Sequence, residues 1–150
     1  MHRRSILWAA ASAFGAAFAA SRAGAATEAP PATKKLKVVY HLSDHDKAGF
    51  VVGNIQNHLD GVGGPDNVTI ALVVHGQALR AFHVSSANPD LTKHIGQFSR
   101  YGIELVACGN TMKAQKVGVA DLLPGFVAVD QGGVVRIAEL QSQGYLYLRP

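Results

Sequence analysis

The sequence has little cysteine and little charge. Among its 150 residues, Cys108 is the one cysteine, and only 16% are Asp, Glu, Lys or Arg. A single cysteine excludes a disulfide within the chain. Long apolar runs are also missing. The apolar stretch from Ile6 to Ala20 is shorter than the roughly 20 residues that a helix needs to cross a bilayer. The sequence therefore predicts no membrane anchor.

The N-terminal segment has the pattern of an export signal. A short basic stretch, Met1 to Arg4, precedes the apolar run, and Ala23-Gly24-Ala25 forms a small-x-small cleavage site. We expect cleavage near Ala25 and a periplasmic mature protein. Arg3-Arg4-Ser5-Ile6-Leu7 resembles a twin-arginine signal. The alternative is an ordinary secretory signal that happens to contain adjacent arginines.

The mature chain is predicted to be a single, nearly neutral domain. Residues 26–35 contain Pro30-Pro31 and read as a flexible lead-in, and residues 36–150 form the domain. Removal of residues 1–25 takes away three of the 14 basic residues and no acidic one, which leaves 11 against 10. No stretch clusters basic and aromatic side chains, so the sequence does not support nucleic-acid binding.

Apolar strands alternate with amphipathic helices along this domain. In the helix expected from 48 to 59, Val51, Ile55 and Leu59 recur every fourth residue. The pattern predicts strands at 37–42, 68–74, 103–107, 126–129 and 145–148, and helices at 48–59, 91–101, 110–117 and 132–141. Asn110 is the expected cap of the third helix. The alternation predicts a three-layer α/β fold with a five-stranded parallel sheet.

Four polar side chains end successive predicted strands, and they are the candidate site. In a parallel sheet the carboxyl ends of the strands meet at one edge, where ligands bind. With an assumed strand order of 2-1-3-4, the residues would form a row in the order His75, His41, Cys108, Asp130.

Cys108 is the candidate nucleophile of this row. It stands where an apolar strand turns into a helix, whose N-terminal N–H groups favour a thiolate. His41 and His75 would tune or orient that thiolate, which could then carry a sulfane sulfur as a persulfide. Two alternatives remain open at this point. His41, His75 and Cys108 could bind copper or zinc, or the protein could be a structural interaction protein whose cysteine is only a small buried residue.

The residues after Cys108 predict an anion site. Gly109, Asn110 and Thr111 would offer free backbone N–H groups, and Lys113 adds a positive charge in the first turns of the helix. A small sulfur anion such as thiosulfate, sulfite or polysulfide would suit such a site.

Several segments of the domain resemble the DsrE/DsrF-like family. They are Val39–Asp44, Val73–Gly76, Tyr101–Met112 and Gly144–Pro150. The resemblance implies a flavodoxin-like fold, assembly as trimers or hexamers, and transfer of persulfide sulfur between cysteines through one cysteine after the third strand. Cys108 matches that position. We therefore predict a periplasmic, homo-oligomeric sulfur carrier that needs no cofactor and receives sulfur from a partner protein or a small sulfur anion.

Overall fold

A computed structural model describes residues 34–150. The predicted export signal, residues 1–25, lies outside the described residues, as does most of the predicted lead-in. The strands are β1 (Leu36–Leu42), β2 (Val68–Val74), β3 (Glu104–Cys108), β4 (Phe126–Val129) and β5 (Leu146–Leu148). The helices are α1 (Ala48–Gly61), α2 (Pro89–Arg100), α3 (Gly109–Gln115) and α4 (Gly133–Ser142). Within residues 34–150, none of the helices has the length and apolar character needed to span a membrane.

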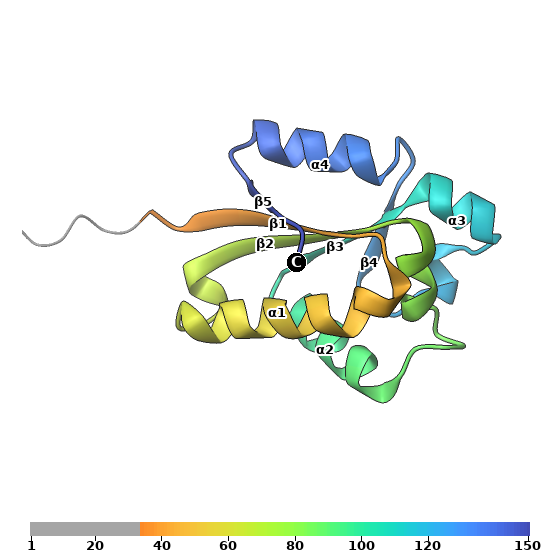
Figure 1. Cartoon of the computed structure of the whole chain (residues 1–150), viewed down its shortest axis with the longest axis horizontal. Coiled ribbons are helices and arrows are strands. Elements are labelled where there is room, and N and C mark those ends of the chain that lie inside the picture. Colours follow the sequence, from red (N-terminus) through yellow and green to blue (C-terminus); the bar gives the residue numbers. More distant parts are fainter. Residues whose placement is uncertain (1–33) are drawn as a thin grey trace, which may run out of the picture. The chain divides into compact units, whose positions relative to one another are not determined.

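The five strands form one parallel sheet in the order β4-β3-β2-β1-β5. Helices α1 and α2 cover one face, and α4 covers the other (Figure 1). The predicted three-layer α/β, flavodoxin-like fold with a five-stranded parallel sheet is therefore confirmed.

The strand order differs from the assumed 2-1-3-4. β2 lies between β1 and β3, so β1 has no contact with β3 as a sheet neighbour. With this order, the handedness of the crossovers explains which face each helix covers. The chain steps in one direction from β1 to β4, and right-handed connections place the intervening helices on one face. The return step from β4 to β5, beside β1, places α4 on the opposite face. The assumed row is therefore wrong in its order, which becomes His41, His75, Cys108, Asp130.

Two apolar cores hold the layers together. The larger one lies between the sheet, α1 and α2, and also includes Met112 of α3. The smaller one lies under α4 and consists of Val39, Ala71, Val73, Val106, Ile137 and Leu140. Because side chains alternate between the faces of a strand, β1, β2 and β3 each contribute to both cores. A single helix thus covers the face of the sheet that carries the smaller core.

No loop residue separates β3 from α3. Cys108 ends the strand and is also the N-cap of the helix, with φ −67° and ψ 117° and no capping side chain. The predicted cap at Asn110 is therefore wrong, since that residue already lies inside the helix. Gly109 follows at once, and a Cβ there would lie 2.8 Å from the carbonyl oxygen of Val129 and 3.1 Å from Cα of Asp130. A glycine at 109 is what lets the β3–α3 turn pack against the end of β4.

We expect Gly109→Ala to lower the free energy of unfolding by about 1–3 kcal/mol, because the new methyl group meets backbone that cannot move aside easily. Gly53→Ala is the matched control, since a Cβ at Gly53 in α1 meets no atom within 4 Å. This control should raise stability by about 0.5–1 kcal/mol through helix propensity. Urea unfolding followed by circular dichroism measures both, and a Gly109→Ala protein as stable as the wild type would contradict the close packing.

Candidate functional site

Cys108, His75 and His41 all face the α4 side of the sheet. Each lies two residues beyond a strand residue of the smaller core, namely Val106, Val73 and Val39. Because the side-chain period of a strand is two, the polar residue and the core residue share a face. The sequence alone does not fix which face each residue takes, and the structure shows that the three lie on the same one.

Cys108 lies where the connections that leave the sheet diverge. The chain leaves β3 into α3, whose Met112 belongs to the larger core, and leaves the neighbouring β4 toward α4, which covers the face with the smaller core (Figure 1). In open α/β sheets, ligands bind in the crevice outside the carboxyl ends of two such strands. The topology therefore selects the end of β3 as the candidate site.

Hydrogen-bond donors surround the sulfur of Cys108. Burial, to 7% exposure, by itself raises the pKa of this thiol. The N–H of Gly133, the hydroxyl of Thr111 and the N–H groups of Thr111 and Asn110 oppose this effect by donating to Sγ. The donors prevail, so the pKa of Cys108 lies below its ordinary value, and the site stabilises a thiolate.

Thr111 connects this sulfur to the loop after β2. Its Oγ1 accepts a hydrogen bond of 2.9 Å from the N–H of Gly76, which leaves the hydroxyl proton free to point at Cys108. Gln115 adds a second tie, donating from Nε2 to the carbonyl oxygen of Gly76 at 2.9 Å. The loop that begins at His75 is thereby fixed to the helix that begins after Cys108.

Two glycines at the start of α4 complete the surroundings of the sulfur. Gly132 has φ 103°, and a Cβ there would lie 3.9 Å from Sγ of Cys108 and 2.8 Å from Nδ2 of Asn110. A Cβ on Gly133 would lie 3.3 Å from Cβ of Cys108 and 3.5 Å from Cβ of His75. The backbone of α4 thus approaches closely enough to donate an N–H to the sulfur, and it lies against both Cys108 and His75.

The two histidines bond to each other rather than to the thiol. Nε2 of His41 lies 2.5 Å from Nε2 of His75, and Nδ1 of His41 lies 2.6 Å from Oη of Tyr147 in β5. Within residues 34–150 no hydrogen bond joins Cys108 to either histidine. Sequence reasoning missed Tyr147. Its alternation with Leu146 and Leu148 was visible, but its place opposite Val39 depends on the strand order.

The environment keeps both histidines uncharged. Burial lowers the pKa of His41 to about 4, assisted by the charges of His75 and Arg149 and opposed by Asp44. Burial also lowers the pKa of His75, again with Arg149 assisting and Asp44 opposing. At neutral pH the pair consists of two neutral imidazoles, and an imidazolium–thiolate ion pair with Cys108 does not form.

The remaining predicted residues fall in two groups. Gly109, Asn110 and Thr111 lie beside the sulfur, with the N–H groups of the last two turned onto it. Lys113 is exposed on α3, and Asp130 is exposed just after β4. In the part of the chain that the structure describes, no three His, Cys, Asp or Glu side chains are grouped so that they could hold a metal ion. The predicted set of His41, His75 and Cys108 is therefore not assembled as a metal site there.

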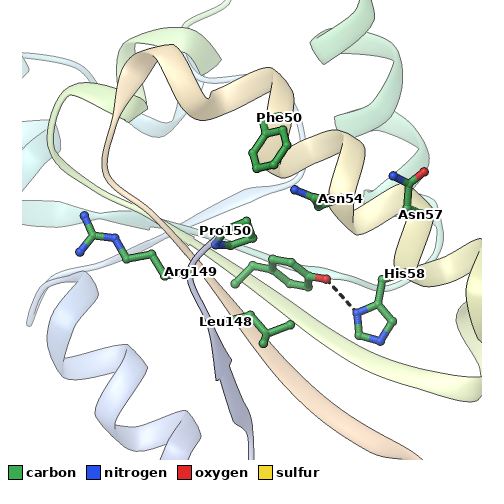
Figure 2. A pocket seen from close by; sticks show the side chains of 8 residues that line it. Phe50, Asn54, Asn57, His58, Leu148, Arg149 and Pro150 are labelled. Atoms are coloured by element: carbon green, nitrogen blue, oxygen red, sulfur yellow. Dashed lines mark hydrogen bonds between the residues drawn. The ribbon is translucent and has the colours of Figure 1, made fainter.

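A groove of about 610 Å³ lies on the other side of the sheet (Figure 2). It runs between Phe50, Asn54 and His58 of α1 and the C-terminal residues Leu148 and Pro150. At its floor, Tyr40 Oη and His58 Nδ1 form a hydrogen bond of 2.8 Å. Tyr40 belongs to the core on the α1–α2 face, whereas Cys108 faces α4, so this groove is separate from the candidate site.

We expect Thr111→Val to raise the pKa of Cys108 by about one unit, because a hydrogen bond to a charged group contributes about 1.5–3 kcal/mol. The pH dependence of alkylation by iodoacetamide gives this pKa. Thr111→Ser keeps the hydroxyl and is the matched control, with a pKa close to that of the wild type. Equal pKa values of Cys108 in the valine and serine variants would show that the Thr111 hydroxyl does not donate to Sγ.

The lowered pKa of His41 predicts a loss of stability in acid. Between about pH 6.5 and about pH 4 the unfolded chain binds a proton at His41 that the folded protein does not bind. The free energy of unfolding should therefore fall as the pH drops through this window. Urea unfolding at several pH values measures the slope, which should be shallower in His41→Asn. Parallel curves for the two proteins would contradict the neutral histidine pair.

Comparison with known proteins places the chain in a family. Residues 10–150 match the model of the DsrE/DsrF-like family. No curated protein matches the sequence. A protein of unknown function from Methanobacterium thermoautotrophicum, MTH1491, is similar in structure, with a TM-score of 0.67 and 24% identity over 77% of this chain and 100% of that one.

Two other solved structures share the fold. BT1422, a conserved protein of unknown function from Bacteroides thetaiotaomicron, has a TM-score of 0.56 and 15% identity over 76% of this chain and 94% of its own. The ychN protein from E. coli has a TM-score of 0.54 and 10% identity over 77% of this chain and 99% of its own. These identities support the fold alone, whereas the family model matches most of the sequence. The chain therefore belongs to the DsrE/DsrF-like family, whose members are generally related to sulfur relay.

Proposed function

We propose that the protein is a periplasmic sulfur carrier in which Cys108 accepts sulfane sulfur as a persulfide. The observation that carries the proposal is the set of donors around Sγ, which stabilises a thiolate at the carboxyl ends of β3 and β4. A thiolate is the reactive form of cysteine, and its formation is the first requirement of sulfur transfer. The family's general relation to sulfur relay supports the same chemistry.

The proposed transfer forms one S–S bond and breaks another. The thiolate of Cys108 attacks the terminal sulfur of a donor persulfide, R–S–SH. The donor's S–S bond breaks, Cys108 becomes Cys108–S–SH, and the donor leaves as the thiolate R–S⁻. No electrons are gained or lost overall, so the step needs no oxidant and no cofactor.

The surroundings of the sulfur suit a small or extended donor. Cys108 is only 7% exposed, so a bulky thiol has little access to Sγ. Gly132 has no side chain that would cover the sulfur, and a Cβ there would come within 3.9 Å of it. Lys113 lies in the next turn of α3, exposed and with no salt-bridge partner within residues 34–150. Gly109, Asn110, Thr111 and Lys113 thus favour an anionic donor such as polysulfide.

Assembly into a homo-oligomer, a trimer or hexamer, is part of the proposal. Apolar side chains remain exposed near both edges of the sheet. Val127 is 51% and Val134 66% exposed near β4, and Leu146 is 53% exposed on β5. Surfaces of this kind mark protein contacts more often than isolated apolar residues do. The partner that supplies or takes the sulfur would use part of the same surface.

We expect protein incubated with polysulfide to gain about 32 Da, the mass of one sulfur atom, at Cys108, because the hydrogen-bond donors around Sγ favour a thiolate that can attack. Intact mass spectrometry under denaturing conditions measures the gain, and Cys108→Ser, which should gain nothing, is the control. Native spectra of protein taken from the periplasm test the alternatives. A metal-sized mass that disappears on denaturation would favour the metal-binding function, and no change of either kind would leave Cys108 as a packing residue.

A further inference from the structure

Tyr147, His41 and His75 form a continuous line of hydrogen bonds across three strands. Oη of Tyr147 lies 2.6 Å from Nδ1 of His41, and Nε2 of His41 lies 2.5 Å from Nε2 of His75. The two imidazole planes differ by 21° and their centroids are 4.7 Å apart. With the nitrogens so much closer than the ring centres, the rings meet edge to edge at Nε2. This is the geometry of an N–H···N hydrogen bond.

The protons on this line have two consistent arrangements. A neutral imidazole carries one N–H and one bare nitrogen, and a tyrosine hydroxyl both donates and accepts. In the first arrangement, Tyr147 donates to Nδ1 of His41, Nε2–H of His41 donates to His75, and Nδ1 of His75 carries a proton. In the second, every bond is reversed and Nδ1 of His75 is bare. Moving from one to the other shifts a proton along the whole line.

The two ends of the line differ in their surroundings. Tyr147 is 40% exposed, so its hydroxyl reaches solvent. His75 stands at the other end, where its Cβ and that of Cys108 flank Gly133 at 3.5 and 3.3 Å from the position of an added Cβ. The charged groups near the line are Arg149 and Asp44, which lie 3.7 Å apart, and Arg149 also donates to Ser43. One end of the line thus meets water, and the other starts from a residue whose Cβ lies next to that of Cys108, under Gly133.

We propose that Tyr147, His41 and His75 are a proton relay. It delivers a proton to the thiolate that leaves the donor during sulfur transfer to Cys108. This inference rests on the proposed function. When Cys108 takes the terminal sulfur of R–S–SH, the leaving R–S⁻ accepts the proton from Nδ1 of His75. His75 then regains a proton at Nε2 from His41, His41 regains one at Nδ1 from Tyr147, and the Tyr147 phenolate takes one from a buffer acid. Tyr147 is a positioning residue, because it acts through His41.

The rates of alkylation and of sulfur uptake distinguish a proton relay from a change in the reactivity of the Cys108 thiol. Alkylation by iodoacetamide needs the thiolate of Cys108, but its leaving group is iodide, which takes no proton. Sulfur uptake from an alkyl persulfide needs the thiolate of Cys108 and also a proton for the leaving R–S⁻. We expect Tyr147→Phe and His41→Gln to slow sulfur uptake about a hundredfold or more, within the range of general acid catalysis, and to leave alkylation unchanged. A higher concentration of buffer acid should restore uptake in these variants. Tyr145→Phe, which makes the same change two residues earlier, should leave both rates unchanged.

Other outcomes overturn the relay. If the rates of sulfur uptake and alkylation fell together in these variants, the histidines would act on the reactivity of the thiol itself. If the rate of uptake did not change, the histidines would have no part in the transfer. A metal ion in the native mass spectrum that His41→Gln abolishes would mean that the two Nε2 atoms bind a cation instead of sharing a proton.

Nuclear magnetic resonance of ¹⁵N-labelled protein tests the line without any sulfur chemistry. Spin coupling between the two Nε2 nuclei across the hydrogen bond is expected in the wild type. Tyr147→Phe should also shift the ¹⁵N resonances of His41, as its Nδ1 loses the hydroxyl. Absence of both effects overturns the relay. Wild-type protein that shows them but takes up no sulfur would instead overturn the proposed function.

Discussion

The close approach of two backbone turns controls this structure. The turn from β3 into α3 and the turn from β4 into α4 meet at Gly109, Gly132 and Gly133, where added side chains would collide with backbone or with the site. This contact orients the N–H of Gly133 toward Cys108 and holds α4 across the sheet. The chemistry of the sulfur and the packing of the second face of the sheet therefore depend on the same three positions.

Much of the fold could be predicted from the sequence because its signals are local. Periodicity separated the strands from the helices, and the break after Val106-Ala107 placed Cys108 at the end of a strand. The strand order was not predictable in this way, because an apolar strand such as Val68–Val74 fits beside several neighbours equally well. The order depends on pairing between segments far apart in the chain, such as that of β5 with β1.

The same limit applies to the site. Cys108, His41 and His75 were found as strand-end residues, and they do lie on one face of the sheet. Their partners were not found. The donors to Sγ are mainly backbone N–H groups, which have no sequence signature apart from the glycines that allow the approach. Tyr147 depends on β5 pairing with β1, a contact between residues about 100 positions apart in the chain. The site thus divides into a sulfur with backbone donors and a histidine pair with a tyrosine.

The small core under α4 gives the thiol a further property. Only Ile137 and Leu140 of this helix belong to that core, so few apolar side chains hold the helix on the sheet. Local opening of a protein begins where few apolar contacts hold an element in place. Each time α4 detaches, Cys108 loses both its cover and the N–H of Gly133. The accessibility of this thiol therefore reports the docking equilibrium of α4, and an engineered contact that fastened the helix would also slow every reaction that reaches the sulfur by that route.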